Sequence, residues 1–385
     1  MIKRVVVSFA SVSALLLVNA ACDGDVGPAE GEGEGEGEGE GEGEGEGEGE
    51  GEGEGEPPPV CPVGDSVLGT AVLGAGFVVK ANVAAPEDPA QWYALAIDVV
   101  ADVPHVIALT SALQVNDYGA WPTLSISDAI PANLAAADFS DDTYVGSYLI
   151  ATPGQLVAGF TSLSACPGFI CEGAVVINDR SGNGGNNTFI SAPNNYSGAA
   201  FVDEGTTRAL FNAGGLATLS GPGIYGFDDL VTPQAAAVVA LSGASERLVV
   251  SANTTFIGNY NLTSFAPEFF AVDNSAVAGA FDTPATSPAL PATPFATFDS
   301  VFGAATLGDA LAIVEGAPDF SAQTRLVVVG VTRTDGVIAA AAEQDVLTLD
   351  ACTTVDFVAA MGDDLLVSLN DNGTGRLLQI GRVAN

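Results

Sequence analysis

One short segment carries oxygen-bearing side chains at alternate positions. Asp179, Ser181 and Asn183 are separated by single residues, and Gly184 occupies the sixth place of the segment. Carboxylate, hydroxyl and amide oxygens at this spacing, with a glycine for a sharp turn, could wrap a calcium ion. The glutamate that would complete such a loop is absent, because Ile190 stands at the twelfth place. We therefore expect no cofactor and favour a polar turn between strands at these three residues, with a calcium site as the alternative.

Four cysteines could form disulfides. Apart from Cys22 they are Cys61, Cys166, Cys171 and Cys352. An even number of cysteines in an exported chain predicts two disulfides. We expect Cys166 to pair with Cys171 around a short loop, which leaves Cys61 to pair with Cys352. The alternative is a metal site, but the chain has one histidine and lacks the paired Cys-X-X-Cys spacing that zinc sites use.

Acid–base chemistry by carboxylates is the catalytic possibility that remains. His105 is the only imidazole, and no Gly-X-Ser-X-Gly segment accompanies it. No glycine-rich phosphate-binding loop precedes a helical pattern, so we do not expect nucleotide binding. The chain contains 48 Asp and Glu residues. Pairs of them could act as acid and base, but sequence spacing does not reveal which carboxyl groups lie close in space.

The N-terminus has the pattern of an export signal. Lys3 and Arg4 precede a largely apolar stretch over residues 5–18, which is too short to span a bilayer. Cys22 follows two alanines, so residues 1–22 resemble a bacterial lipoprotein signal, although Asn19 stands where leucine is usual. The resemblance implies cleavage after residue 21, lipid attachment to Cys22 and anchoring in the bacterial cell envelope. We expect the outer membrane or the cell surface, with the inner membrane or a non-lipidated signal peptide as alternatives.

Residues 22–60 predict an unfolded linker. Gly-Glu is repeated without a break over residues 31–56. Glycines weaken a helix, and in a strand every glutamate would lie on one face and repel its neighbours. The tract also buries no apolar surface that could offset the entropy of ordering it. We therefore expect a spacer between a signal peptide of residues 1–21 and a folded domain of residues 61–385.

The folded part is strongly acidic in its own right. Without residues 1–60 it retains 8 basic and 32 acidic residues, which gives a formal net charge of −24. Such a surface disfavours nucleic acid, because binding to phosphates needs lysine and arginine. The expected partners are the membrane, through the lipid anchor, and a protein or glycan ligand.

Short apolar runs bounded by turn residues predict an all-β fold for residues 61–385. The strongest runs follow a small or acidic turn and recur about every fifty residues, the size of four strands with their turns. Their index residues are Val106, Val157, Leu210, Val249, Leu311 and Leu366.

A turn–strand–turn–strand cadence, as in residues 362–369 and 376–380, resembles the β-propeller class. The resemblance implies about six blades, with a Cys61–Cys352 disulfide as the clasp that closes the ring. The alternative is a set of tandem β-sandwich domains, whose strands also recur at short intervals.

From these features we expect an envelope-tethered, non-catalytic binding or structural protein with an acidic β-domain. The alternative function is a carboxylate-dependent propeller hydrolase or lyase that acts on envelope polysaccharide.

Overall fold

The structure is a computed structural model of the full chain. It describes residues 77–85, 88–98, 103–110, 124–125, 144–162, 173–179, 188–191, 195–213, 223–227, 237–241, 247–261, 263–264, 266–283, 286–372 and 374–381. The chain divides into two compact units, residues 1–60 and 61–385, and every described residue belongs to the second.

The described residues form six antiparallel sheets, each built from strands that follow one another along the chain. The first two sheets contain β1 (Phe77–Ala85), β2 (Asp88–Asp98), β3 (Val103–Thr110) and β4 (Leu124–Ser125), and then β5 (Tyr144–Ala151), β6 (Gln155–Ser162), β7 (Gly173–Asp179) and β8 (Thr188–Ser191). The next two contain β9 (Gly198–Asp203), β10 (Thr206–Ala213), β11 (Gly223–Phe227) and β12 (Val239–Ala240), and then β13 (Arg247–Val250), β14 (Thr254–Tyr260), β15 (Pro267–Asp273) and β16 (Ala296–Thr297). The last two contain β17 (Val301–Leu307), β18 (Ala310–Gly316), β19 (Gln323–Thr334) and β20 (Val337–Thr348), and then β21 (Thr353–Met361), β22 (Asp364–Asp371) and β23 (Thr374–Ile380).

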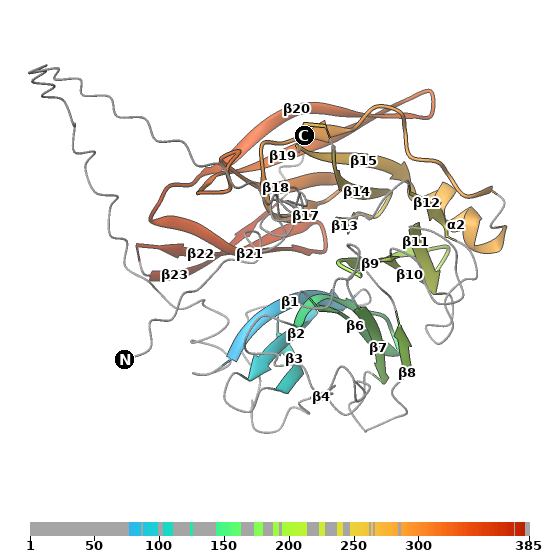
Figure 1. The fold of residues 1–385 in the computed structure, drawn as a ribbon, viewed down its shortest axis with the longest axis horizontal. Coiled ribbons are helices and arrows are strands. Elements are labelled where there is room, and N and C mark those ends of the chain that lie inside the picture. The colour runs from blue at the N-terminus through green and yellow to red at the C-terminus, as the bar shows by residue number, and fades with distance from the viewer. Residues whose placement is uncertain are drawn as a thin grey trace, which may run out of the picture. The chain divides into compact units, whose positions relative to one another are not determined.

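The first strands of the six sheets form a closed ring. β1 contacts β5, β5 contacts β9, and the series continues through β13, β17 and β21 back to β1. Figure 1 shows these strands near the middle of the domain and the later strands of each sheet at its periphery. This is a β-propeller, and we call the sheets blades 1 to 6 in chain order. The predicted all-β class and the predicted propeller of about six blades are confirmed.

Four of the six index residues lie on the second strand of their blade, and the other two do not. Val157, Leu210, Leu311 and Leu366 lie on second strands, whereas Val106 lies on β3 and Val249 on β13. First and third strands are also apolar here, because a blade is covered on both faces. Apolar runs alone therefore identified strands but not their order within the blade.

The apolar core lies between successive blades. On β10, Phe211 packs with Tyr148 and Val157 of blade 2, whereas its neighbour Leu210 packs with Ile257 of blade 4. Phe211 and Leu210 are both fully buried. Adjacent residues of one strand thus enter different interfaces, which explains why the strands read as continuous apolar runs.

Tight turns follow the glycine signals of the sequence. Asp335-Gly336 joins β19 to β20 with φ of 51° and 78°, and Glu204-Gly205 joins β9 to β10 with φ of 47° and 82°. Positive φ at both central residues is the type I′ geometry that matches strand twist, and glycine adopts it without strain. These turns hold the two hairpins in register.

Helix α2 (Asn274–Asp282) fills the space between blades 3 and 4. The Asp273 side chain caps it by accepting a hydrogen bond from the Ser275 amide, and Val277 and Phe281 join the core between these blades. Among the described residues, no helix is long and apolar enough to cross a membrane.

Candidate functional site

The predicted calcium ligands are not assembled by the part of the chain that the structure describes. Asp179 is the last residue of β7, whereas Ser181 and Asn183 lie outside the described residues. Within the described ranges, no group of three or more His, Cys, Asp or Glu side chains could hold a metal ion. The calcium site therefore stays a prediction.

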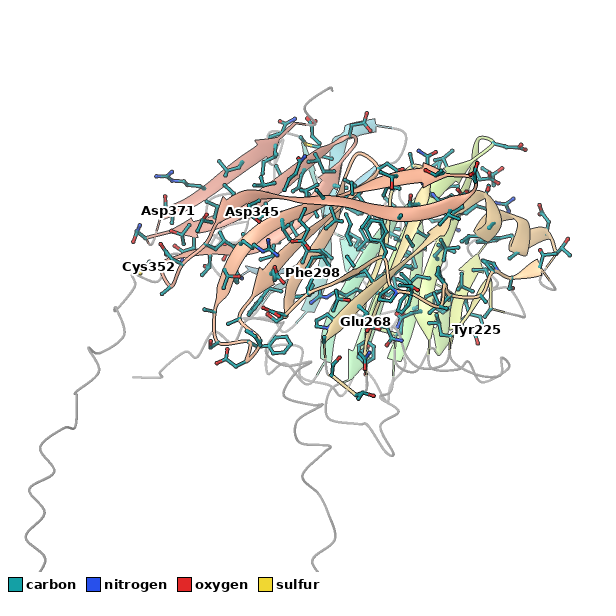
Figure 2. All side chains as sticks on the ribbon, turned by 90° about the horizontal axis from the view of Figure 1, so that it is seen from above. Tyr225, Glu268, Phe298, Asp345, Cys352 and Asp371 are labelled. Atoms are coloured by element: carbon teal, nitrogen blue, oxygen red, sulfur yellow. The ribbon has the colours of Figure 1, made fainter. Side chains whose placement is uncertain are left out.

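Cys352 forms a disulfide, and it lies in the turn that leads into β21. Its amide donates a hydrogen bond of 2.8 Å to Asp350 Oδ1, and its carbonyl accepts one of 2.9 Å from the amide of Asn372. Cys352 and Asp371 occupy the same end of blade 6 (Figure 2). Cys61, Cys166, Cys171 and Cys22 lie outside the described residues, so the expected pairings stay predictions.

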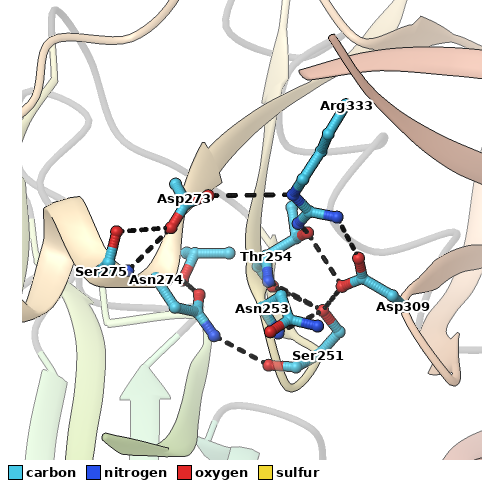
Figure 3. Close-up of polar contacts among 9 residues, drawn as sticks. Ser251, Asn253, Thr254, Asp273, Asn274, Ser275, Asp309 and Arg333 are labelled. Carbon is cyan, nitrogen blue, oxygen red and sulfur yellow. Dashed lines mark hydrogen bonds and ion pairs between the residues drawn. The ribbon is translucent and has the colours of Figure 1, made fainter. Parts of the chain in front are cut away.

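One polar cluster of the described residues joins blades 4 and 5 at the turns between their first and second strands (Figure 3). Asp309 lies in the β17–β18 turn, and its carboxylate binds Arg333 of β19. Asp309 Oδ1 also accepts hydrogen bonds from two hydroxyls of blade 4, those of Ser251 and Thr254, the latter at 2.9 Å. Arg333 in turn donates to Thr254 and lies 3.8 Å from Asp273.

The turn between β13 and β14 is held in place from the start of α2. Asn274 Nδ2 donates to the carbonyl of Ser251 at 2.9 Å, and Asn274 Oδ1 accepts from the Thr255 hydroxyl at 2.7 Å. Asn274 is buried, so both ends of its amide are used inside the protein. The hydroxyls that face Asp309 are therefore fixed in position.

This cluster contains two carboxylates bridged by one guanidinium. Where two carboxyl groups act together in a glycosidase, they lie about 5 to 10 Å apart with the sugar between them. Here Arg333 occupies the space between Asp273 and Asp309 and binds oxygens of both. The remaining oxygen of Asp273 caps α2. The cluster thus joins blades 4 and 5 and does not form an acid–base pair.

A second cluster surrounds Arg325 on the outer strands of blade 5. Its guanidinium binds Glu315 at 2.6 Å, Asp345 at 2.8 Å and Glu343 at 2.9 Å. Partial burial acts to lower the pKa of Arg325, but the hydrogen bonds that its guanidinium donates to these carboxylates outweigh this effect and raise that pKa. The second oxygen of Glu315 accepts from the amide of Asp299 at 3.0 Å. These carboxylates are also committed to partners within the protein.

Asp356 differs from these acids. No hydrogen bond or ion pair joins it to another described residue, although it lies on β21, a first strand of the ring. The residue is exposed, but desolvation by the surrounding protein raises the pKa of its carboxyl group from 3.8 to about 6. An unpaired carboxyl group with a pKa near neutrality can exchange a proton with a bound molecule.

A β-bulge presents Asp356. Val355 pairs with Leu369 and Phe357 pairs with Ser368, so Asp356 is the extra residue inserted between them. Asp356 and Phe357 thus lie opposite Ser368, whose hydroxyl is fully buried and has no hydrogen-bond partner among the described residues. Bulges re-aim side chains and are frequent next to active sites.

Asp356 was not among the candidate residues predicted from the sequence. The available signal was a single carboxylate inside an apolar run, between Val355 and Phe357. An isolated acid in such a run also fits a solvent-facing strand position, and the bulge depends on pairing with β22, which the run itself does not encode.

The comparisons with known proteins concern the fold. No family model matches the chain, and no curated protein matches it in sequence. A solved glucose dehydrogenase is similar at a TM-score of 0.48 and 11% identity, over 79% of this chain and 96% of its own. An ancestral GH74 enzyme has a TM-score of 0.44 at 12% identity, over 80% of this chain and 43% of its own. The Trypanosoma rangeli sialidase, solved with sialic acid, has a TM-score of 0.41 at 12% identity, over 80% of this chain and 54% of its own.

These names correct one expectation. The three solved structures named above are described as enzymes, and the expectation of a non-catalytic binding or structural protein is therefore not retained. At this identity the likeness concerns the arrangement of strands, and no substrate or residue role is carried over from it. The fold and the site define a β-propeller that carries, on its inner ring, a carboxyl group with no partner among the described residues.

Replacing Arg333 by methionine is expected to lower the free energy of unfolding by about 2 kcal/mol, because Asp309 loses its charged donor while its carboxylate stays between two blades. The matched control is Arg376→Met, which also removes one positive charge. Arg376 is 59% exposed and binds Asp371 at 3.0 Å, so its loss is expected to cost less than about 1 kcal/mol. Urea unfolding of both variants measures the difference. Equal losses would show that the blade 4–blade 5 cluster contributes no more than a surface ion pair.

Replacing Asp356 by asparagine is expected to stabilise the protein at alkaline pH. The pKa is raised in the folded state, so the stabilising contribution of the protonated group is present at low pH and is lost as the pH rises through about 6. We expect a gain of about 1 kcal/mol at about pH 8, an amount reduced by solvent screening, and almost none at about pH 3.5. Thermal melting of both proteins at each pH provides the measurement. A variant that is less stable than the parent at both values would contradict the raised pKa.

Proposed function

We propose that this chain is a carboxylate-dependent hydrolase or lyase that cleaves polysaccharide of the bacterial cell envelope, with Asp356 as its proton donor. Breaking a glycosidic bond by hydrolysis or by elimination requires a proton on the departing oxygen. A carboxyl group with an ordinary pKa is almost fully ionised at neutral pH and delivers that proton poorly. The pKa of about 6 at Asp356 keeps a fraction of this group protonated there.

The observation that carries this proposal is the contrast between Asp356 and the paired acids. Asp309, Glu315 and Asp371 each bind an arginine, so their oxygens already have partners. Asp356 has none among the described residues, and a bulge of the ring strand sets it apart from the regular ladder. Among the described carboxyl groups, Asp356 is therefore the one best placed to interact with a ligand.

Residues 1–60 support a location for this activity. We propose that the chain is exported and anchored through lipid on Cys22, with residues 22–60 as a tether between the membrane and the propeller. A diacylglyceryl group with a further acyl chain anchors stably, since two or more chains hold a protein at a bilayer. Glutamates of the repeat lie about 7 Å apart when extended, within a Debye length at physiological salt, so they repel one another and extend the tether. A tethered enzyme of this form would act on polymers within reach of the membrane.

The anchor is tested by expressing the full chain and its Cys22→Ser variant in a Gram-negative host. We expect the parent chain to fractionate with membranes and to show, by intact mass, loss of residues 1–21 and the added mass of lipid. The variant is expected to lose both the lipid mass and the membrane association, because serine lacks the thiol that accepts the lipid. A parent protein that carries an unmodified Cys22, or that lacks Cys22 altogether, would rule out the anchor.

The activity is tested on three polymers: peptidoglycan, a neutral β-glucan and a polyuronate. We expect the parent protein to release new reducing ends from at least one of them, with kcat/KM falling about tenfold per pH unit above about pH 6, because the proton donor becomes ionised. Asp356→Asn is expected to lower this rate by at least about a hundredfold, the usual contribution of a general acid. Ultraviolet absorbance of the products separates elimination, which leaves an unsaturated sugar, from hydrolysis.

Asp363→Asn is the matched control. Asp363 lies in the exposed turn at the other end of β21, so this variant makes the same chemical change in the same blade and is expected to keep the parent rate. Equal activity of the parent and the Asp356→Asn protein, or no cleavage of any of the three polymers, would refute the proposed function.

A further inference from the structure

Gln323 uses both ends of its amide on one residue of the next blade. It begins β19 of blade 5 and is 7% exposed. Its Nε2 donates to the carbonyl of Val355 at 2.9 Å, and its Oε1 accepts from the amide of Val355 at 2.6 Å. The side chain thus gives Val355 the donor and acceptor that a neighbouring strand would give.

The clamped residue is the last one before the bulge. Val355 still pairs with Leu369 of β22, and the ladder shifts at the following residue, Asp356. Val355 is itself buried in the core between blades 5 and 6. Val355 thus lies opposite Leu369 on one side and exchanges its backbone hydrogen bonds with Gln323 on the other, and the inserted residue Asp356 follows immediately after it.

Blade 5 contains an equivalent arrangement without an acid. Val301 of β17 precedes a bulge at Phe302, and Arg247 of blade 4 donates to the Val301 carbonyl at 2.9 Å. Phe302 packs against the ring of Phe320, with centroids 6.2 Å apart. A side chain of one blade thus holds the next first strand just before its bulge in both places. Of these two bulges, only the one in blade 6 carries an ionisable residue.

The two clamps differ in charge. Arginine has donors only and would place a positive charge close to the bulge, whereas glutamine is neutral and also accepts from the amide. A positive charge near Asp356 would favour its ionised form. The neutral amide of Gln323 makes two hydrogen bonds to Val355 without adding a charge, so it leaves the carboxyl group able to keep its proton.

We infer that Gln323 is a positioning residue: its amide clamps Val355 and thereby holds the bulge that presents Asp356. The functional meaning of this inference rests on the proposed role of Asp356, but the physical claim does not require any activity. Losing the clamp frees the start of β21, so the bulge can relax and the Asp356 carboxylate, already partly in contact with water, becomes better solvated.

The charged groups around β21 come from the strands that contact it. Those with the most contacts to β21 are β1, β17 and β22, whose titratable residues are Lys80 on β1 and Asp364 and Asp371 on β22. A fourth strand, β19, reaches Val355 through Gln323 and carries Arg325 and Arg333; these bind the carboxylates of Glu315, Glu343 and Asp345 and of Asp273 and Asp309. Asp364 accepts from Gln379 at 2.6 Å, and Asp371 binds Arg376. Desolvation is the cause of the raised pKa of Asp356, so a change in its water access is the effect to measure.

The test is a pH titration of the full chain, labelled with ¹³C at the aspartate carboxyl groups and followed by NMR. The signal of Asp356 is the one that is absent from the spectrum of the Asp356→Asn protein. In Gln323→Met, which removes both hydrogen bonds but fills a similar volume, we expect the pKa of Asp356 to fall from about 6 by at least about one unit toward 3.8. Gln323→Asn keeps a neutral amide that is too short to reach both atoms of Val355. It is expected to shift the pKa in the same direction by less, and it decides the question if the methionine variant does not fold.

Thr161→Val is the matched control. The Thr161 hydroxyl of blade 2 donates to the carbonyl of Asn195, just before blade 3, at 2.6 Å, so this neutral and nearly isosteric change also removes one inter-blade hydrogen bond. It is expected to leave the pKa of Asp356 unchanged. An unchanged pKa in the folded Gln323 variants, or an equal shift in Thr161→Val, would overturn the inference.

The outcome is distinguishable from that of the proposed function. The titration uses no substrate, so a downward shift in the Gln323 variants upholds the inference even if the parent protein cleaves no polysaccharide. Conversely, activity that is lost in Asp356→Asn while the pKa stays constant in the folded Gln323 variants would leave the proposed function intact and exclude Gln323 from it.

Discussion

Burial of both faces of every blade is the constraint on which this structure depends. A single four-stranded sheet of this composition would expose apolar side chains on two sides, and neighbours such as Leu210 and Phe211 point into different interfaces. A blade is therefore stable only between two others, and the ring formed by the contacts of β1 with β5 and β21 leaves no blade without a neighbour. Because each interface is apolar, its hydrophobic stabilisation is not directional and does not by itself set how far one blade slides along the next.

Polar side chains form the directional contacts that position one blade along the next. At one end of the blades, Asp309 joins hydroxyls of blade 4 to Arg333 of blade 5. At the other end, Arg247 and Gln323 reach from one blade to the first strand of the next. These groups are directional and partly or fully removed from water, so leaving one of them unpaired costs more than the bond contributes when made. The register between blades is thus set by a few hydrogen bonds on an apolar background.

The same arrangement separates structural acids from the candidate functional one. The chain is rich in carboxylates and poor in cations, so each arginine of the clusters gathers several acids, as Arg325 does with Glu315, Glu343 and Asp345. Asp356 is held by backbone geometry instead of by a charge, which leaves its carboxyl group unpaired among the described residues. Its surroundings disfavour the ionised form without providing a partner, the condition under which a carboxyl group retains a proton near neutral pH.

The amino-acid sequence by itself determined the strands, the glycine turns and the roughly fifty-residue recurrence, because these depend on local preferences and on the apolar character of strands covered on both faces. It did not determine which strand of a blade each run forms, as Val106 and Val249 show, since first, second and third strands are apolar alike. Only the tertiary structure decided that Asp309 is paired and Asp356 is not, because a bulge, an inter-blade clamp and an ion pair each join residues distant in the sequence. A local sequence pattern reflects the conformational preferences of the residues in it. The pKa and the partner of a carboxyl group depend instead on the residues that other parts of the chain place around it.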